Sequence, residues 1–262
     1  GLDGLRGVLA FNSLASCVWI VILLTKGIVS GLSFGVGALL WGLLYGLVSA
    51  AFLLCKMQAL STGPVSLTAF IGCSSLLIST AFGVFVLREG ATLLQWLGVG
   101  LLCVSLFLIS APKTGSAEKS WKFWCAAFFV CSAATGISFK LQQRSESASE
   151  VDEMLIVSAV TAALIFGLTA IFLPRNGSPE VPVSALPYAF LCGVFACVYN
   201  RLNVNLSGLL PCVIFFPVFN GSVIILSTLA GVILFKERLK RSQIIGMIIG
   251  SAALMLASGC VG

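Results

Sequence analysis

The side chains of this sequence that could bind a solute are mostly neutral, polar or aromatic, and they lie inside long apolar runs. Buried hydroxyl and amide groups need hydrogen-bond partners, and asparagine is costly against lipid, so these groups should face protein or a cavity. The candidate substrate-binding residues are Tyr45, Ser74, Ser75, Thr135, Ser138, Lys140, Tyr199, Asn200, Asn203, Phe219 and Asn220. Hydrogen bonding between helices is the alternative role for the neutral ones. Lys140 either meets an anion or extends to the lipid headgroups.

Catalytic chemistry has few residues available in this chain. The sequence contains no histidine, which excludes Ser-His-Asp and Cys-His catalytic sets, histidine-ligated metals and imidazole proton relays. The ten cysteines lie in or beside apolar runs without a C-x-x-C pair, so we interpret them as packing residues. We expect no enzyme activity, no catalytic residue, no cofactor and no metal.

All nine carboxylates fall near the ends of the apolar runs. Proton pumps usually place a carboxylate or a histidine inside the membrane, so this distribution argues against proton-driven antiport. Glu89 and Glu237 each stand beside a basic residue at such an end. For both we favour ion pairing or anchoring at the membrane surface over substrate binding.

The amino-acid composition indicates which kind of secondary structure positions the candidate side chains. Of 262 residues, 59% are hydrophobic and 9% are charged, whereas a typical soluble domain has about 25% charged residues. Apolar runs of about twenty residues without alternation predict membrane-spanning helices and not barrel strands. We therefore expect an all-α polytopic membrane protein with spans at 5–25, 33–57, 63–87, 92–111, 121–141, 153–173, 184–203, 207–235 and 242–260.

Proline and glycine predict local features of three of these helices. Pro217 lies inside the eighth span, where its missing N–H and its ring predict a bend. Two G-x-x-x-G pairs allow close contact between helices, either within the chain or in a dimer, and we favour contact within the chain. The pairs are Gly42 with Gly46 and Gly246 with Gly250.

The sequence contains an internal repeat. GVFVLREGATLLQWLGVGLLCVSLFLIS resembles GVILFKERLKRSQIIGMIIGSAALMLAS, with Arg88-Glu89 matching Lys236-Glu237 and Gln95 matching Gln243 at one offset of 148 residues. The second copy has five predicted spans and the first has four, so we expect a helix to be missing before Gly1. Copies of five helices enter the membrane from opposite sides, which is the inverted repeat typical of transporters.

This repeated pattern resembles the EamA-type half of the drug/metabolite transporter superfamily. The segment FKERLKRSQIIG, at 235–246, is close to the family pattern. Arg88-Glu89-Gly90 departs from it, since no arginine follows the glutamate, and a role for that arginine is not carried over to the first copy. The resemblance implies two repeats, ten helices, and transport of metabolites such as amino acids, sugars, nucleotide sugars or drugs.

The domain organisation that we expect follows the repeat. Residues 1–111 form a first EamA-like repeat of four helices, 112–120 a connecting loop, and 121–262 a second repeat of five helices. We expect a membrane transporter for a small metabolite or drug-like solute, which works by alternating access in facilitated or exchange mode. A non-transporting membrane partner or scaffold protein is the alternative.

The net charge of +6 is better explained by membrane orientation than by nucleic-acid binding. Counting the loops alternately places most basic residues on one side, which would be cytoplasmic and would leave the C-terminus outside. Ten-helix relatives more often have both ends in the cytoplasm. We expect a multi-pass protein of a bacterial cytoplasmic membrane, with a small-molecule substrate, the lipid bilayer and a possible homodimer as partners, and no nucleic acid.

Overall fold

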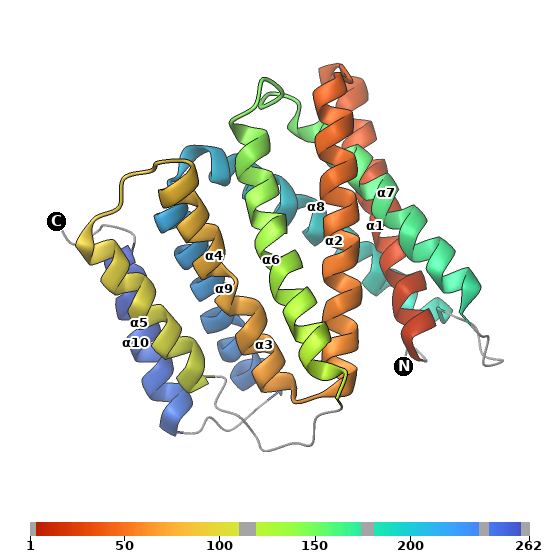
Figure 1. Cartoon of the computed structure of the whole chain (residues 1–262). Coiled ribbons are helices and arrows are strands. Elements are labelled where there is room, and N and C mark those ends of the chain that lie inside the picture. The colour runs from red at the N-terminus through yellow and green to blue at the C-terminus, as the bar shows by residue number, and fades with distance from the viewer. Residues whose placement is uncertain (1–3, 110–118, 174–180, 236–240, 258–262) are drawn as a thin grey trace. The chain divides into compact units, whose positions relative to one another are not determined.

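The computed structural model describes residues 4–109, 119–173, 181–235 and 241–257, and every regular element within them is a helix (Figure 1). Five segments of these residues are long and apolar enough to cross a membrane. They are α1 (Gly4–Ser30), α2 (Val36–Thr62), α6 (Trp121–Gln143), α7 (Val151–Phe172) and α8 (Leu186–Leu209), the last preceded by the short η2 (Val183–Ala185). The chain is therefore an α-helical membrane protein.

The remaining helices include the largest departure from the predicted spans. The run at 63–87 is divided into α3 (Val65–Ser74), α4 (Leu76–Ala81) and a π-helical turn, η1 (Phe82–Val86). Each of the other predicted spans overlaps mainly with one α-helix, with different bounds; among these helices are α5 (Leu93–Ile109), α9 (Cys212–Phe235) and α10 (Arg241–Ala257). α9 begins at Cys212 and not at 207, because Pro211 cannot continue α8.

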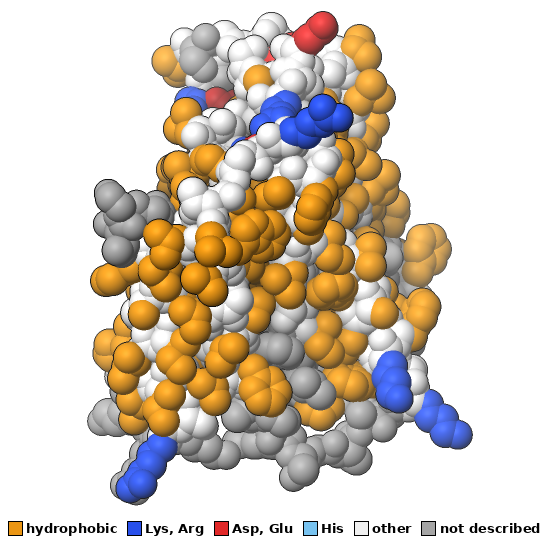
Figure 2. All heavy atoms as spheres, turned by 60° about the vertical axis from the view of Figure 1, so that its left-hand side comes forward, with side chains coloured by type: hydrophobic (Ala, Val, Ile, Leu, Met, Phe, Trp, Pro, Cys, Tyr) orange, Lys and Arg blue, Asp and Glu red, His pale blue; other side chains and the backbone are white. Residues whose placement is uncertain are grey.

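Apolar side chains cover the sides of the helices, as a lipid environment requires. Leu40, Val130 and Phe195 are among the large hydrophobic residues exposed at the surface. On the face drawn in Figure 2, hydrophobic side chains cover the middle, and the Lys and Arg side chains gather toward the two ends. Helices satisfy their own backbone groups, so such a surface is stable against lipid.

The chain divides into two compact units. Unit 1 comprises Gly1–Ala51 and Ser138–Gly208, and unit 2 comprises Phe52–Ile137 and Leu209–Gly262. The boundaries fall inside α2 and α6, so each of these helices contributes to both units. In unit 1, α1 packs against α7; in unit 2, α5 packs against α10 and α4 against α9.

Glycines allow close contact between helices in both units. A Cβ atom on Gly42 would lie 2.7 Å from the carbonyl oxygen of Met154, and one on Gly46 would lie 2.9 Å from that of Ser158, both in α7. In unit 2, a Cβ atom on Gly246 would meet Leu108 at 3.0 Å. The predicted close contacts of the glycine pairs are confirmed as packing within the chain.

Candidate functional site

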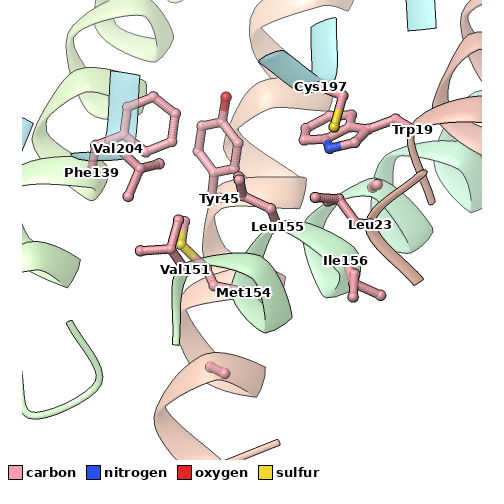
Figure 3. Close-up of a cluster of buried hydrophobic side chains, with 12 residues drawn as sticks. Trp19, Leu23, Tyr45, Phe139, Val151, Met154, Leu155, Ile156, Cys197 and Val204 are labelled. Carbon is pink, nitrogen blue, oxygen red and sulfur yellow. The ribbon is translucent and has the colours of Figure 1, made fainter. Parts of the chain in front are cut away.

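A buried hydrogen bond between α2 and α8 is the centre of the polar group in unit 1. The Tyr45 hydroxyl donates to Oδ1 of Asn200 over 2.6 Å, and Nδ2 of Asn200 donates to the carbonyl of Ala196. The Tyr45 ring lies 4.4 Å from the Phe139 ring, centroid to centroid, and Val204 is beside them in the same apolar cluster (Figure 3). Two candidates from distant parts of the sequence, Tyr45 and Asn200, thus meet as a pair.

The neighbouring candidates in unit 1 take different positions. Asn203 is buried, and its Nδ2 donates to the carbonyl of Tyr199 one turn earlier in α8. The Tyr199 side chain is exposed and so lies outside the buried cluster, whereas Ser138 is buried. The structure therefore gathers Tyr45, Asn200 and Asn203 on inward faces and leaves Tyr199 at the surface.

Lys140 is a buried cation at the end of a helix. Its side chain is 3% exposed, and Nζ donates to the carbonyl oxygen of Ser207 over 2.8 Å. Ser207 belongs to the last turn of α8, where carbonyl groups lack intrahelical donors and the helix dipole favours positive charge. Lys140 therefore stabilises the C-terminus of α8 from inside unit 1 and does not extend to the surface. Its role as an anion partner stays a prediction.

In unit 2, hydroxyl groups join the run of α3 and α4 to α6. Oγ of Ser75 and Oγ of Ser132 are 2.7 Å apart, and Oγ of Ser79 donates to the carbonyl of Ala133 over 3.4 Å. The Ser75 N–H bonds to the carbonyl of Gly72, a three-residue step that tightens the chain where α3 gives way to α4. Ser75 thus combines this tightened helical step with a polar contact to α6.

Ser74 and Thr135 are the other two candidates on this side of unit 2. Ser74, the last residue of α3, is half-buried. Thr135 bonds within its own helix, because its hydroxyl donates to the carbonyl of Ser132 over 2.7 Å.

The proline-containing helix α9 contributes the remaining candidates. Pro217 lies inside it, so the carbonyl of Val213 cannot receive its usual hydrogen bond from residue 217. Nδ2 of Asn220 donates to the carbonyl of Phe216 over 2.9 Å, and the Phe219 ring stacks on that of Phe215 at 5.7 Å. The two candidates, Phe219 and Asn220, therefore lie within one helical turn after Pro217.

Thr80 is a polar residue in the same region that the sequence did not single out. Its side chain is fully buried, and its hydroxyl has no hydrogen-bond partner in the described part of the chain. Leu76 and Gly83, one turn to either side, both contact α9, so Thr80 lies on the face of α4 that meets α9. A buried hydroxyl without a partner is costly, and the π-helical turn that follows it is a feature often found at functional sites.

Trp19 is a second polar group that the sequence analysis missed. Its indole is 8% exposed in the core of unit 1, next to Cys197 (Figure 3), and its N–H has no partner among the described residues. From the sequence alone, a tryptophan inside an apolar run is interpreted as a core residue or as a residue that faces lipid. Only the fold shows that its N–H is enclosed.

Most of the described carboxylates lie at or near helix ends and are engaged by other groups, whereas Glu146 is exposed in the turn between α6 and α7. Oε2 of Glu89 accepts a hydrogen bond from the backbone N–H of Cys212, the first residue of α9. Glu150 and Glu153 accept from the N–H groups of Ala38 and Ser33, which lie at the connection from α1 to α2. Glu237 lies outside the described residues, so its predicted role stays a prediction.

Comparison with known proteins supports the fold without indicating an activity. No family model matches the sequence, and no curated protein matches it. A solved structure named "Crystal structure of protein" has a TM-score of 0.78 over 99% of this chain and 89% of its own, with 13% sequence identity. At that identity the likeness shows a shared fold alone.

Proposed function

We propose that this chain is a membrane transporter that moves a small metabolite or drug-like solute by alternating access. The observation that carries the proposal lies in unit 2, where the irregular helical run α3–α4–η1, with a three-residue hydrogen-bond step at Ser75 and a π-helical turn at Phe82–Val86, packs against the proline-containing helix α9. Transporters commonly bind their solutes at discontinuous helices near the middle of the membrane, where backbone and hydroxyl groups are released from regular bonding. Thr80 supplies one such group at this contact.

Helix boundaries support an EamA-like inverted repeat. α5 covers 93–109 and α10 covers 241–257, so both ends are separated by 148 residues. α2 covers 36–62, and η2 with α8 covers 183–209, so here both ends are separated by 147 residues. Matching helices of the two copies also pack together, namely α1 with α7, α4 with α9 and α5 with α10. This pairing is what two related halves with swapped helices would produce.

The transport mode that we propose is facilitated movement or exchange. The described carboxylates Glu89, Glu150, Asp152 and Glu153 lie at or near helix ends, in contact with backbone N–H groups or basic side chains, and proton pumps generally need an acidic group deeper in the membrane. Buried polar groups of unit 2, such as Ser75 and Thr80, suit a solute that is recognised by hydrogen bonds. We place the protein in a bacterial cytoplasmic membrane.

Substituting Thr80 by valine tests the proposed site. Valine has nearly the same shape, and removing a buried hydroxyl that lacks a partner should leave the fold as stable or more stable. A transporter that uses this hydroxyl should nevertheless lose flux, by about tenfold for the loss of one hydrogen bond of about 1.4 kcal/mol. The measurement is saturable solute uptake into proteoliposomes that contain the purified protein.

Thr25→Val is the matched control, because Thr25 is exposed and its hydroxyl bonds to the carbonyl of Ile22 in its own helix. Reduced flux for Thr80→Val alone, with unchanged thermal stability, would support the site. Equal flux for both variants and the parent would remove Thr80 from the solute path. A folded protein without saturable flux of any solute would favour the partner or scaffold role.

A further inference from the structure

α2 and α8 are matching helices of the repeat proposed above. At an offset of 147 residues, Leu44 and Gly46 of α2 correspond to Leu191 and Gly193 of α8. A Cβ atom on Gly46 would lie 2.9 Å from a carbonyl oxygen of α7, and one on Gly193 would lie 2.6 Å from a carbonyl oxygen of α1. Because α1 and α7 also begin at matching positions, residues 4 and 151, the two glycine contacts are equivalent. α2 and α8 therefore have equivalent places in unit 1.

α6 covers one face of α2. The Tyr45 ring lies 4.4 Å from the Phe139 ring, and the Phe52 ring lies 5.2 Å from the Phe128 ring, centroid to centroid. The Cys55 thiol hydrogen-bonds with a cysteine of α6. Residues that follow Tyr45 by seven and ten positions lie on the same side of the helix, so these three α2 side chains define the face that α6 covers. Tyr45 is buried there, and the other two are half-buried.

The matching face of α8 is exposed. Cys192, Tyr199 and Leu202 are the α8 residues that correspond to the three α2 side chains at the offset of 147 residues. Cys192 is exposed, and Tyr199 and Leu202 are 49% and 55% exposed. Phe195, between them on the same side of the helix, is 64% exposed. Within the described part of the chain, α2 is thus covered on this face and α8 is not.

We propose that this face of α8 binds one further apolar transmembrane helix, with small and aromatic side chains like those of α6. The fold itself indicates this occupant, because α6 covers the same face of the equivalent helix α2. The exposed side chains are uncharged, so van der Waals packing and an aromatic contact at Tyr199 hold the added helix. The inference rests on the repeat of the preceding proposal but not on transport, and it is tested without a solute.

Disulfide cross-linking to the purified full chain tests where the added helix lies. The probe is a synthetic peptide of residues 119–143 that carries Phe139→Cys and has alanine in place of its own two cysteines. Phe139 contacts Tyr45 of α2, so the cysteine of a bound peptide should lie beside Cys192, the matching residue of α8. With copper phenanthroline in detergent, the two thiols release two protons, pass two electrons to copper(II) and form one disulfide. We expect the cross-link at Cys192 and not at Cys17, an exposed cysteine of α1 that serves as the internal control.

Binding of a fluorescently labelled α6 peptide, followed by its anisotropy, tests the face itself. Tyr199→Ala removes the proposed aromatic contact and should weaken binding about fivefold. Phe190→Ala is the matched control, because Phe190 is also exposed on α8 but precedes Tyr199 by nine residues, which puts it on the opposite side of the helix. This control should leave peptide binding unchanged.

Three results would overturn the proposal and leave the face to lipid: no binding of the peptide, equal cross-linking at Cys17 and Cys192, or equal losses in Tyr199→Ala and Phe190→Ala. A disulfide between Cys192 residues of two chains, formed without peptide, would also overturn it and assign the face to a second copy. Peptide binding by a protein without solute flux would support this inference and contradict the transport proposal alone.

Discussion

Glu89 accepts a hydrogen bond at 2.5 Å from the backbone N–H of Cys212, so a side chain just beyond η1 caps the first residue of α9, 123 residues later. The first N–H groups of a helix have no partner within it, and the helix dipole favours negative charge there. This contact holds the start of α9 against η1, at the point where Gly83 lets Cys212 approach. Glu89, which lies outside the predicted membrane-spanning runs, thus helps to position α9 within unit 2.

Removing the Glu89 carboxylate should destabilise unit 2. We expect Glu89→Ala to lower the free energy of unfolding by about 1–2 kcal/mol, as loss of a helix cap does. Glu89→Gln keeps an acceptor and should lose less. Thermal unfolding in detergent, followed by the reactivity of buried cysteines such as Cys125 and Cys197, measures both effects. Glu146→Ala removes an exposed carboxylate as a control; an equal loss there would show that the cap is not the cause.

Arg88 holds a backbone conformation that glycine adopts more easily. Its φ is +55°, and the N–H of Glu89 bonds back to the carbonyl of Gly83, as at a helix end that closes with a left-handed residue. Because a side chain in this region costs about 1–2 kcal/mol, Arg88→Gly should raise thermal stability by part of that amount. Arg88→Ala keeps a Cβ and should give no gain. Equal melting temperatures for the glycine and alanine variants would contradict this explanation.

Gly46 should resist enlargement by even one methyl group. A Cβ atom there would lie 2.6 Å from Cβ of Thr161 and 2.9 Å from the carbonyl oxygen of Ser158, so α2 and α7 would have to separate. We expect Gly46→Ala to cost about 1–3 kcal/mol of stability, the usual penalty of overpacking. Gly100→Ala is the matched control, because a Cβ atom at Gly100 has nothing within 4 Å. It should be neutral or stabilising, and similar losses in both would mean that helix packing is not responsible.

Tyr45 and Asn200 should be energetically coupled. The effects of Tyr45→Phe and Asn200→Leu on the free energy of unfolding should not add, because either change alone removes their hydrogen bond. We expect a coupling energy of about 1 kcal/mol, in the range measured for hydrogen bonds between membrane helices. The double-mutant cycle in detergent gives this value directly. Additive effects would mean that the bond contributes nothing to stability.

The helices follow from the sequence because apolar runs of sufficient length have one stable form in lipid. The close contacts at Gly42 and Gly46 follow as well, since small residues four apart form a shallow helix face. The division of 63–87 does not, because the turn at Ser75 is accompanied by a hydroxyl contact with Ser132, 57 residues away. Local composition carries no sign of that partner.

Individual candidate residues could be predicted from the sequence more readily than the residues that they contact in the fold. Asparagine and tyrosine in apolar runs indicate inward faces, so Tyr45 and Asn200 could be chosen separately, but their pairing depends on how α2 and α8 cross. Lys140 could be placed near a helix end, while its bond to Ser207 depends on where α8 ends. Thr80 could not be chosen at all, because threonine is common in apolar helices and only the packing of α4 against α9 leaves its hydroxyl enclosed.

Counterflow in proteoliposomes tests the central claim most directly. The vesicles would be loaded with a mixture of amino acids, sugars and nucleotides, and the entry of trace labelled members of the same mixture would be followed. A transporter working by exchange should accumulate one chemical class, without a proton gradient, and Asn220→Leu should reduce this accumulation while the protein stays folded. No accumulation of any class, from protein shown to be folded, would contradict the account and favour a membrane partner or scaffold.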